Sequence, residues 1–165
     1  GETLNPKMDT LVRLSDSLGI PYGTLVSDSV HSPTPTVARL VPVIRFASLA
    51  VAASARTSVP SSEMRMCPVS HGSRTFAFRV EGDAMTAPHP GQKTYPPGCL
   101  VFVDPDVPAS NGQPVAALLA SGYPVFRILV RDGGQEWLRP INPVYPPTMS
   151  GFEIVGAVVG KWEDP

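Results

Sequence analysis

Arg79-Val80-Glu81-Gly82-Asp83-Ala84-Met85 is the stretch that decides the fold of this 165-residue chain. It ends a strand-like run, Thr75–Val80, at a Gly-Asp pair, and these two residue types favour tight turns. Such a turn presents the small side chain of Ala84. Downstream, Pro97-Gly98 introduces the apolar run Cys99–Val103. The pattern therefore indicates two short strands joined by a long connection. This connection begins with a turn that exposes the side chain of residue 84.

Similar short runs recur along the rest of the chain. They are Val41–Phe46 upstream and Pro114–Ala120, Val125–Arg131, Gln135–Arg139 and Phe152–Val159 downstream. Asp132-Gly133-Gly134 predicts a hairpin between two of them, whereas Ser58–Ser73 reads as irregular. Twenty prolines and fourteen glycines do not suit a helical bundle. We therefore predict a mainly β fold, with a mostly antiparallel sheet and an interior core.

Composition limits the possible partners. Thirteen Lys and Arg balance fourteen Asp and Glu, so the net charge of −1 indicates no nucleic-acid surface. No apolar run is long enough to span a bilayer, so we expect no membrane association. Cys67 and Cys99 lack C-x-x-C spacing, which favours reduced packing residues. Without a signal-like segment, the cytoplasm is the default location.

The first 40 residues differ from the rest. Asn5-Pro6 suits a helix start, an apolar stripe follows, and Gly19 suits a helix end. A second short helix is expected over residues 21–27. Residues 28–40 form a linker by composition, because the prolines of His31–Thr36 favour extended backbone.

Several motifs occur in the order found in one known family. They are Gly82–Met85, the segment Pro97–Pro105, Asn111–Val115 and Leu138–Asn142. Together they resemble the self-cleaving peptidase domain of the LexA, UmuD and phage CI repressors. The resemblance implies a LexA/UmuD-like β-rich C-terminal domain over residues 41–165. Residues 1–27 resemble the last two helices of a Cro/CI-type helix-turn-helix domain whose recognition helix lies upstream; a generic helical hairpin is the alternative.

The resemblance also assigns a serine-lysine dyad to two positions that hold other residues here. The family's serine falls at Ala84, which has no nucleophilic atom. Counted back from Pro140, the family's lysine falls at Arg127, and a guanidinium stays protonated in proteins, so it cannot act as a general base. We therefore expect no catalysis by this chain. Natural loss and a deliberate serine-to-alanine substitution both remain open for position 84.

The resemblance further implies a cleavage-site segment over residues 41–57. Counted from Val41-Pro42-Val43-Ile44, the cleavage-site equivalent is Leu49-Ala50, with Ala52-Ala53 as the alternative register. Neither pair contains the glycine of the family's Ala-Gly site. Because Ala47–Ala55 consists largely of small residues, we expect this run to be flexible or easily repositioned.

The resemblance implies the C-terminal oligomerisation and regulatory region of a phage or prophage transcriptional repressor. We expect a homodimer or a higher oligomer that binds operator DNA through the missing N-terminal part and is relieved by an antirepressor protein. The alternative is an inactivated form of a self-cleaving repressor that the RecA filament induces in the SOS response. A third reading is an unrelated β-rich interaction domain. From the family's C-terminal interface, the candidate dimer contacts are Trp137, Arg139, Phe152, Ile154, Val158 and Trp162.

Metal binding finds little support. His71, His89, Asp104 and Asp106 carry ligand-type side chains. They show no i, i+4 or C-x-x-C arrangement, which favours turn and surface roles. We therefore expect neither a metal nor a cofactor.

Overall fold

The computed structural model describes residues 39–55 and 59–164. The helices expected within residues 1–27, and the linker as far as residue 38, lie outside the described residues. Within the described part, no helix is long and apolar enough to cross a membrane.

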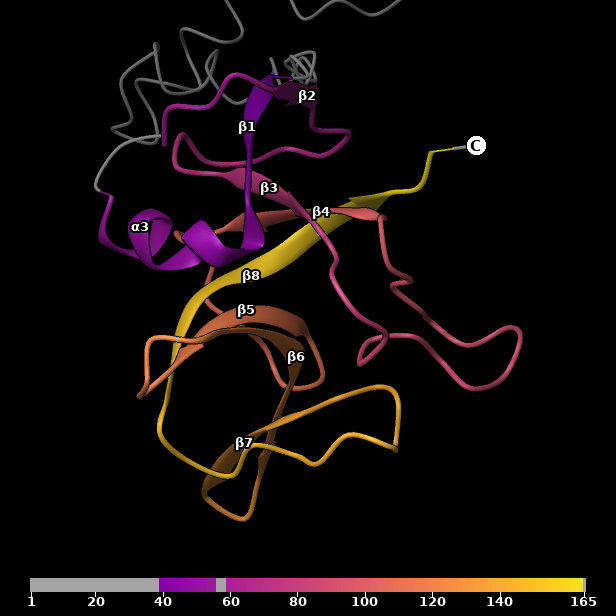
Figure 1. Cartoon of the computed structure of the whole chain (residues 1–165). Helices are drawn as coiled ribbons and strands as arrows, with labels where there is room; N and C mark the ends of the chain where they lie inside the picture. The colour runs from indigo at the N-terminus through magenta and orange to yellow at the C-terminus, as the bar shows by residue number, and fades with distance from the viewer. Residues whose placement is uncertain (1–38, 56–58, 165) are drawn as a thin grey trace, which may run out of the picture. The chain divides into compact units, whose positions relative to one another are not determined.

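An eight-stranded sheet organises the described residues, in the order β2-β1-β3-β4-β8-β5-β6-β7 (Figure 1). Only β1 and β3 pair in parallel; the other neighbouring strands are antiparallel. The strands are β1 (Leu40–Ile44), β2 (Met64–Met66), β3 (Phe76–Arg79), β4 (Leu100–Asp104), β5 (Pro114–Leu119), β6 (Pro124–Asp132), β7 (Gln135–Arg139) and β8 (Phe152–Trp162). The predicted mainly β fold is confirmed.

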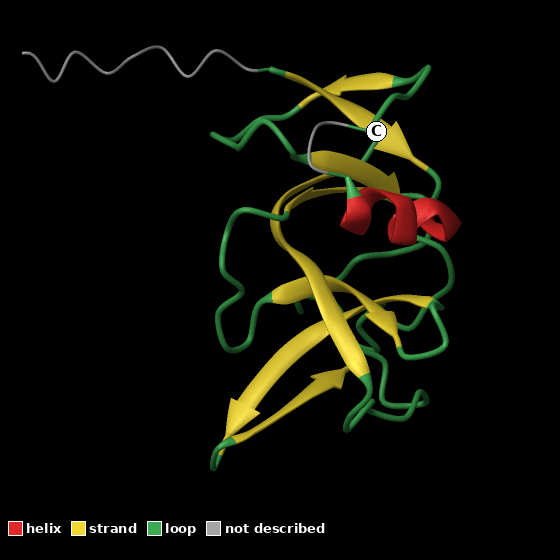
Figure 2. Ribbon diagram, turned by 90° about the vertical axis from the view of Figure 1, so that its left-hand side faces the viewer, coloured by secondary structure: helices red, strands yellow, loops and turns green. Residues whose placement is uncertain are grey.

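Strand β8 joins the two halves of this sheet. Its first half pairs with β5 and its second half with β4, and each pairing contains a register shift. In Figures 1 and 2 the strand runs diagonally between the two groups of strands. Gly156 lies at the crossing, where an added Cβ would stand 2.8 Å from Val103 Cγ1 and 2.9 Å from the Asp104 carbonyl oxygen. The close approach of β8 to β4 therefore requires glycine at this position.

The hairpin between β6 and β7 has the geometry that its sequence predicts. Asp132 pairs with Gln135, and the two residues between them, Gly133 and Gly134, have φ values of 55° and 77°. Positive φ at both central positions characterises the type I′ turn, which matches the twist of antiparallel strands. The Asp-Gly-Gly signal is therefore confirmed.

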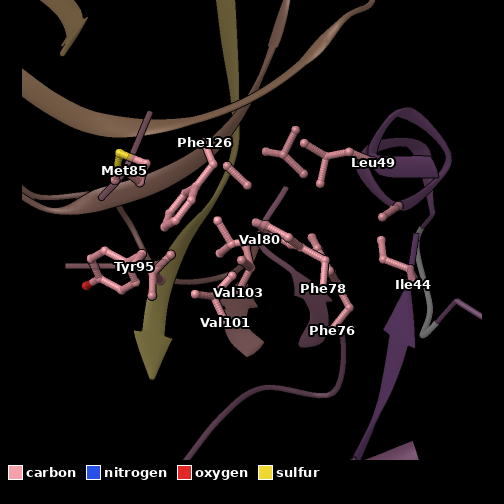
Figure 3. Close-up of a cluster of buried hydrophobic side chains, with 14 of the residues drawn as sticks. Ile44, Leu49, Phe76, Phe78, Val80, Met85, Tyr95, Val101, Val103 and Phe126 are labelled. Carbon is pink, nitrogen blue, oxygen red and sulfur yellow. The ribbon is translucent and has the colours of Figure 1, made fainter. Parts of the chain in front are cut away.

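The largest hydrophobic cluster of the described residues includes Val80 and Met85, which flank the turn that follows β3 (Figure 3). The ring of Phe126 from β6 meets Phe78 of β3 and Tyr95 edge to face, at centroid distances of 5.6 and 5.3 Å. Met85 and Tyr95 come from the connection between β3 and β4, and each is almost fully buried. This connection is consequently anchored to the core rather than hanging free.

One expectation about the segment before β3 was wrong, because strand β2 lies within the stretch read as irregular. The run of small residues folds into a 3-10 turn, η1 (Phe46–Ser48), and a helix, α3 (Leu49–Ser54). Alanine favours helix, and Leu49 and Ala52 are buried in the main cluster. The large apolar side chain of Leu49 thus anchors a run whose other side chains are mostly small.

Candidate functional site

Backbone conformation, hydrogen bonds and burial fix both ends of the turn at residues 82–85. Gly82 adopts a φ of 72°, and the Thr86 amide donates to the Asp83 carbonyl at 3.0 Å. Met85 enters the core, and its carbonyl accepts from the Tyr95 amide at 2.8 Å. Between them, Ala84 stays half-buried at the surface. The turn does present residue 84, as its sequence indicates.

A loop distant in sequence fastens this turn, and we call residues 141–145 the latch. The amides of Ile141 and Asn142 both donate to the Ala84 carbonyl at 3.0 Å. The Asn142 side-chain amide lies 3.3 Å from the Asp83 carbonyl oxygen, and the Tyr145 hydroxyl donates to the Asp83 carboxylate. This last hydrogen bond raises the pKa of Tyr145, because the phenol donates only while protonated. The latch therefore fixes the backbone on which residue 84 stands.

A pocket of about 190 Å³ opens beside the turn. Ala84 and Arg127, the two positions that the resemblance assigned to the dyad, both line it. Its other lining residues are Phe46, Phe78, Val80, Glu81, Gly82, Asp83, Met85, Tyr123, Pro124, Val125, Phe126 and Tyr145. The fold thus brings together two residues that lie 43 positions apart in the chain.

Arg127 enters the pocket from β6 and is half-buried. Its Nη1 donates to the Phe126 carbonyl at 2.7 Å, whereas its buried Nε has no partner among the described residues. Burial lowers the pKa of this guanidinium, because a low-dielectric surrounding disfavours the cation; the nearby Tyr145 and Tyr123 oppose that shift. Arginine nevertheless stays protonated in proteins, so Arg127 gives the pocket a positive charge and cannot itself act as a general base.

The cleavage-site equivalents lie in α3. Leu49 is fully buried, Ala50 is exposed, and the peptide bond between them is part of the helix. In the alternative register, Ala52 is buried and Ala53 half-buried in the same helix. A helical peptide bond is already engaged in the backbone hydrogen-bond ladder, and a nucleophile needs an extended chain to reach its carbonyl. In this conformation neither pair is presented as a substrate.

The candidate dimer contacts fall into different environments. Val158 is only 8% exposed and belongs to the main core, so it offers little surface to a partner. Phe152 and Ile154 are half-buried against a second apolar cluster, while Trp137 is half-buried on β7. Arg139 and Trp162 are exposed, Trp162 at 52%. The surface candidates that remain thus belong to β7 and the two ends of β8.

The ligand-type residues are not gathered for a metal. The buried Asp104 carboxylate accepts the amides of Gly72 and Asp106 at 2.7 and 2.9 Å, which is a turn-stabilising role. His71 Nδ1 lies 2.9 Å from the Gly72 carbonyl oxygen, and His89 is exposed on the β3–β4 connection. Within residues 39–55 and 59–164, no three His, Cys, Asp or Glu side chains form a group that could hold a metal ion.

Sequence reasoning missed several residues around the pocket. Tyr145 gave no signal, because a tyrosine in a Pro-rich loop has no periodicity to read. Asn142 appeared only as part of a motif, and its bonds to Asp83 depend on a contact across 59 positions. Phe46 reached the pocket only because the chain turns into η1 directly after β1.

Comparison with known proteins is consistent with this geometry. The family model described as Peptidase S24-like matches residues 45–159. The chain is 36% identical to the prophage repressor CohE of Escherichia coli over 132 residues, 73% of this chain and 54% of that protein. It is 39% identical to the repressor protein C2 of Salmonella phage P22 over 88 residues, covering 52% and 40% of the two chains.

A longer alignment extends to a LexA repressor of Mycobacterium bovis. It is 31% identical over 149 residues, 90% of this chain and 59% of that protein. The chain therefore spans about half the length of the curated relatives it matches. Because the family model covers most of the chain, and the turn, pocket and sheet agree with it, the chain belongs to the Peptidase S24-like family.

Proposed function

We propose that this chain is the C-terminal regulatory and oligomerisation region of a phage or prophage transcriptional repressor that does not cleave itself. Its relatives include a prophage repressor, a phage repressor protein, a LexA repressor and an HTH-type transcriptional regulator for a conjugative element, which supports a repressor role. The observation that carries the loss of cleavage is the pocket beside the turn, where a methyl group and a guanidinium stand at the dyad positions. Neither can supply a nucleophile or accept its proton.

Restoring the dyad tests this assignment. In the double variant Ala84→Ser/Arg127→Lys, the hydroxyl comes from a turn already fixed by the latch, and burial lowers the pKa of a lysine at position 127. Because the cleavage-site equivalents lie in helix α3, we expect the double variant, like the parent, to keep its intact mass after incubation at alkaline pH. Each single variant serves as the matched control. Cleavage of the unmodified chain would refute the proposal.

We further propose that the region forms a homodimer or a higher oligomer. Pairing would raise the effective concentration of the second DNA-binding domain at a two-fold operator. The exposed Trp162 and Arg139, with Trp137, are the first interface residues to test. Light scattering at high micromolar concentration is expected to give at least twice the monomer mass, and a Trp162→Ser variant to give a smaller one. A monomer in both samples contradicts the oligomerisation role.

Without self-cleavage, release from operator DNA requires another partner, and we propose an antirepressor protein. A pull-down from induced lysogens with the full-length repressor should recover a phage-encoded protein. If only RecA is recovered, release follows the SOS route instead.

The second candidate function is an inactivated self-cleaving repressor, induced by the RecA filament. It is favoured by the intact turn and pocket, which keep positions 84 and 127 together. The two candidates separate on the double variant. Fragmentation after addition of RecA filament supports recent or introduced inactivation, whereas an uncut double variant supports a site that has become a binding module.

A further inference from the structure

Arg127 differs from the other arginines that have polar contacts. Arg65, Arg74, Arg79 and Arg131 each form an ion pair with a carboxylate within the described residues. Arg127 forms none there, although it is half-buried and its Nε is buried without a partner. Its one hydrogen bond to residues 39–55 and 59–164 uses Nη1, which donates to the adjacent Phe126 carbonyl. That bond fixes the side chain while most of its donors stay unused.

A half-buried cation without a counter-ion destabilises the protein unless a ligand supplies the charge. Two carboxylates, of Glu81 and Asp83, line the same pocket, yet neither lies within ion-pair distance of Arg127. The Asp83 carboxylate already accepts from Tyr145 and lies within 3.4 Å of the Asn142 side-chain amide. An ion pair with a carboxylate of the pocket therefore does not account for the arginine at position 127.

The pocket offers complementary chemistry beside the guanidinium. Its volume of about 190 Å³ corresponds to roughly six water molecules at about 30 Å³ each, which is room for one short side chain or a chain end. Phe46, Val80 and Phe126 provide an apolar wall, and the hydroxyl-bearing Tyr123 stands at the exposed rim. A ligand with an apolar stem and a terminal carboxylate matches both parts.

We propose that this pocket binds a carboxylate group of a partner polypeptide, held by the guanidinium fork of Arg127. A planar guanidinium pairs with a carboxylate through two parallel N–H···O bonds, and the terminal Nη donors that the Phe126 carbonyl leaves unused can supply them. The carboxylate belongs either to a chain terminus or to a Glu or Asp side chain. This proposal rests on the proposed function, because it requires a pocket that binds a partner polypeptide and does not cleave a peptide bond.

Two short peptides distinguish the sources of the carboxylate. N-acetyl-trialanine with a free C-terminus carries a terminal carboxylate, and N-acetyl-Ala-Glu-Ala-amide carries only a side-chain carboxylate. N-acetyl-trialanine amide is the uncharged control. Each is titrated into the ¹⁵N-labelled full chain, with the Arg127 Nε–H resonance and the Ala84 and Met85 amides as readouts. We expect at least one carboxylate peptide to shift these resonances saturably and the amide control to leave them unchanged.

Two variants test the role of the guanidinium. Arg127→Gln should weaken binding by about tenfold or more, because a charge-assisted bidentate pair is lost. Arg131→Gln is the matched control from the same strand, since Arg131 is exposed and paired with Glu136; it should bind as the parent does. Equal shifts with the amide control, or undiminished binding by Arg127→Gln, would overturn the proposal.

The comparison of peptides on the unmodified chain does not depend on any variant folding. It is also independent of cleavage. If no carboxylate peptide binds while the chain stays uncut, the pocket proposal fails and the proposed function stands. If the unmodified chain cuts itself, the proposed function fails whatever the titration shows.

Discussion

Truncation of Leu49 to alanine is expected to detach helix α3 from the sheet. Leu49 is fully buried in the main cluster, and the helix that it begins has only six residues, too few to persist without packing. Large-to-small substitutions of buried leucine cost about 2–5 kcal/mol in the free energy of unfolding. With a urea m-value of about 2 kcal/mol/M, the unfolding midpoint should fall by about 1–2.5 M.

Val51 supplies the matched control for this measurement. It lies in the same helix but is 62% exposed, so Val51→Ala should change the free energy of unfolding by less than about 0.5 kcal/mol. Both variants are compared by urea unfolding monitored by tryptophan fluorescence and circular dichroism. If Leu49→Ala is as stable as Val51→Ala, the segment around the cleavage-site equivalent is not held in the helix, and the reasoning about its protection is refuted.

Three further predictions concern the sheet, the latch and a thiol. Gly156→Ala should lower the free energy of unfolding by about 1–3 kcal/mol because its Cβ collides with β4, while Gly160→Ala, with only ordinary contacts of 3.5 Å or more, should be nearly neutral in the same urea titration. Ultraviolet titration should place the pKa of Tyr145 above its ordinary value of about 10, and the variant Asp83→Asn should have a lower Tyr145 pKa than the parent. The hydrogen bond from Tyr145 to Asp83 should stabilise the fold fully at pH values below about 10, and this stabilisation should be lost as the pH rises through the raised pKa. Burial raises the pKa of Cys99 to about 11, so a thiol reagent at pH 8 should modify it only after unfolding, and rapid labelling of the native chain would contradict this.

The strands were predictable because their apolar runs are long enough to cross a buried sheet. Leu100–Asp104 is buried throughout, and β6 buries Val125, Phe126, Ile128 and Leu129. β2 could not be predicted, because Met-Arg-Met is exposed at the sheet edge and only its pairing with Leu40–Pro42 defines it. Helix α3 was missed because small residues carry little pattern, and the burial of one leucine decides their structure.

The candidate site was predictable in part for a similar reason. Ala84 was visible because a glycine turn ends a strand, and Arg127 was assigned by resemblance and by counting from Pro140. The contacts that hold the turn come from the latch, whose hydrogen bonds to Asp83 and Ala84 join segments about 60 residues apart. Local sequence carries no record of such pairings. The unpartnered Arg127 Nε is likewise a property of the packed site and not of its strand.

The central claim, that the pocket holds both dyad positions and cannot cleave, is tested most directly by the mass of the unmodified chain. The 17.5 kDa chain is incubated at alkaline pH and, separately, with activated RecA filament, and is then measured intact by mass spectrometry. We expect a single species of unchanged mass in both samples. Two fragments whose masses add up to the parent plus one water, with the cut within residues 41–57, would contradict it.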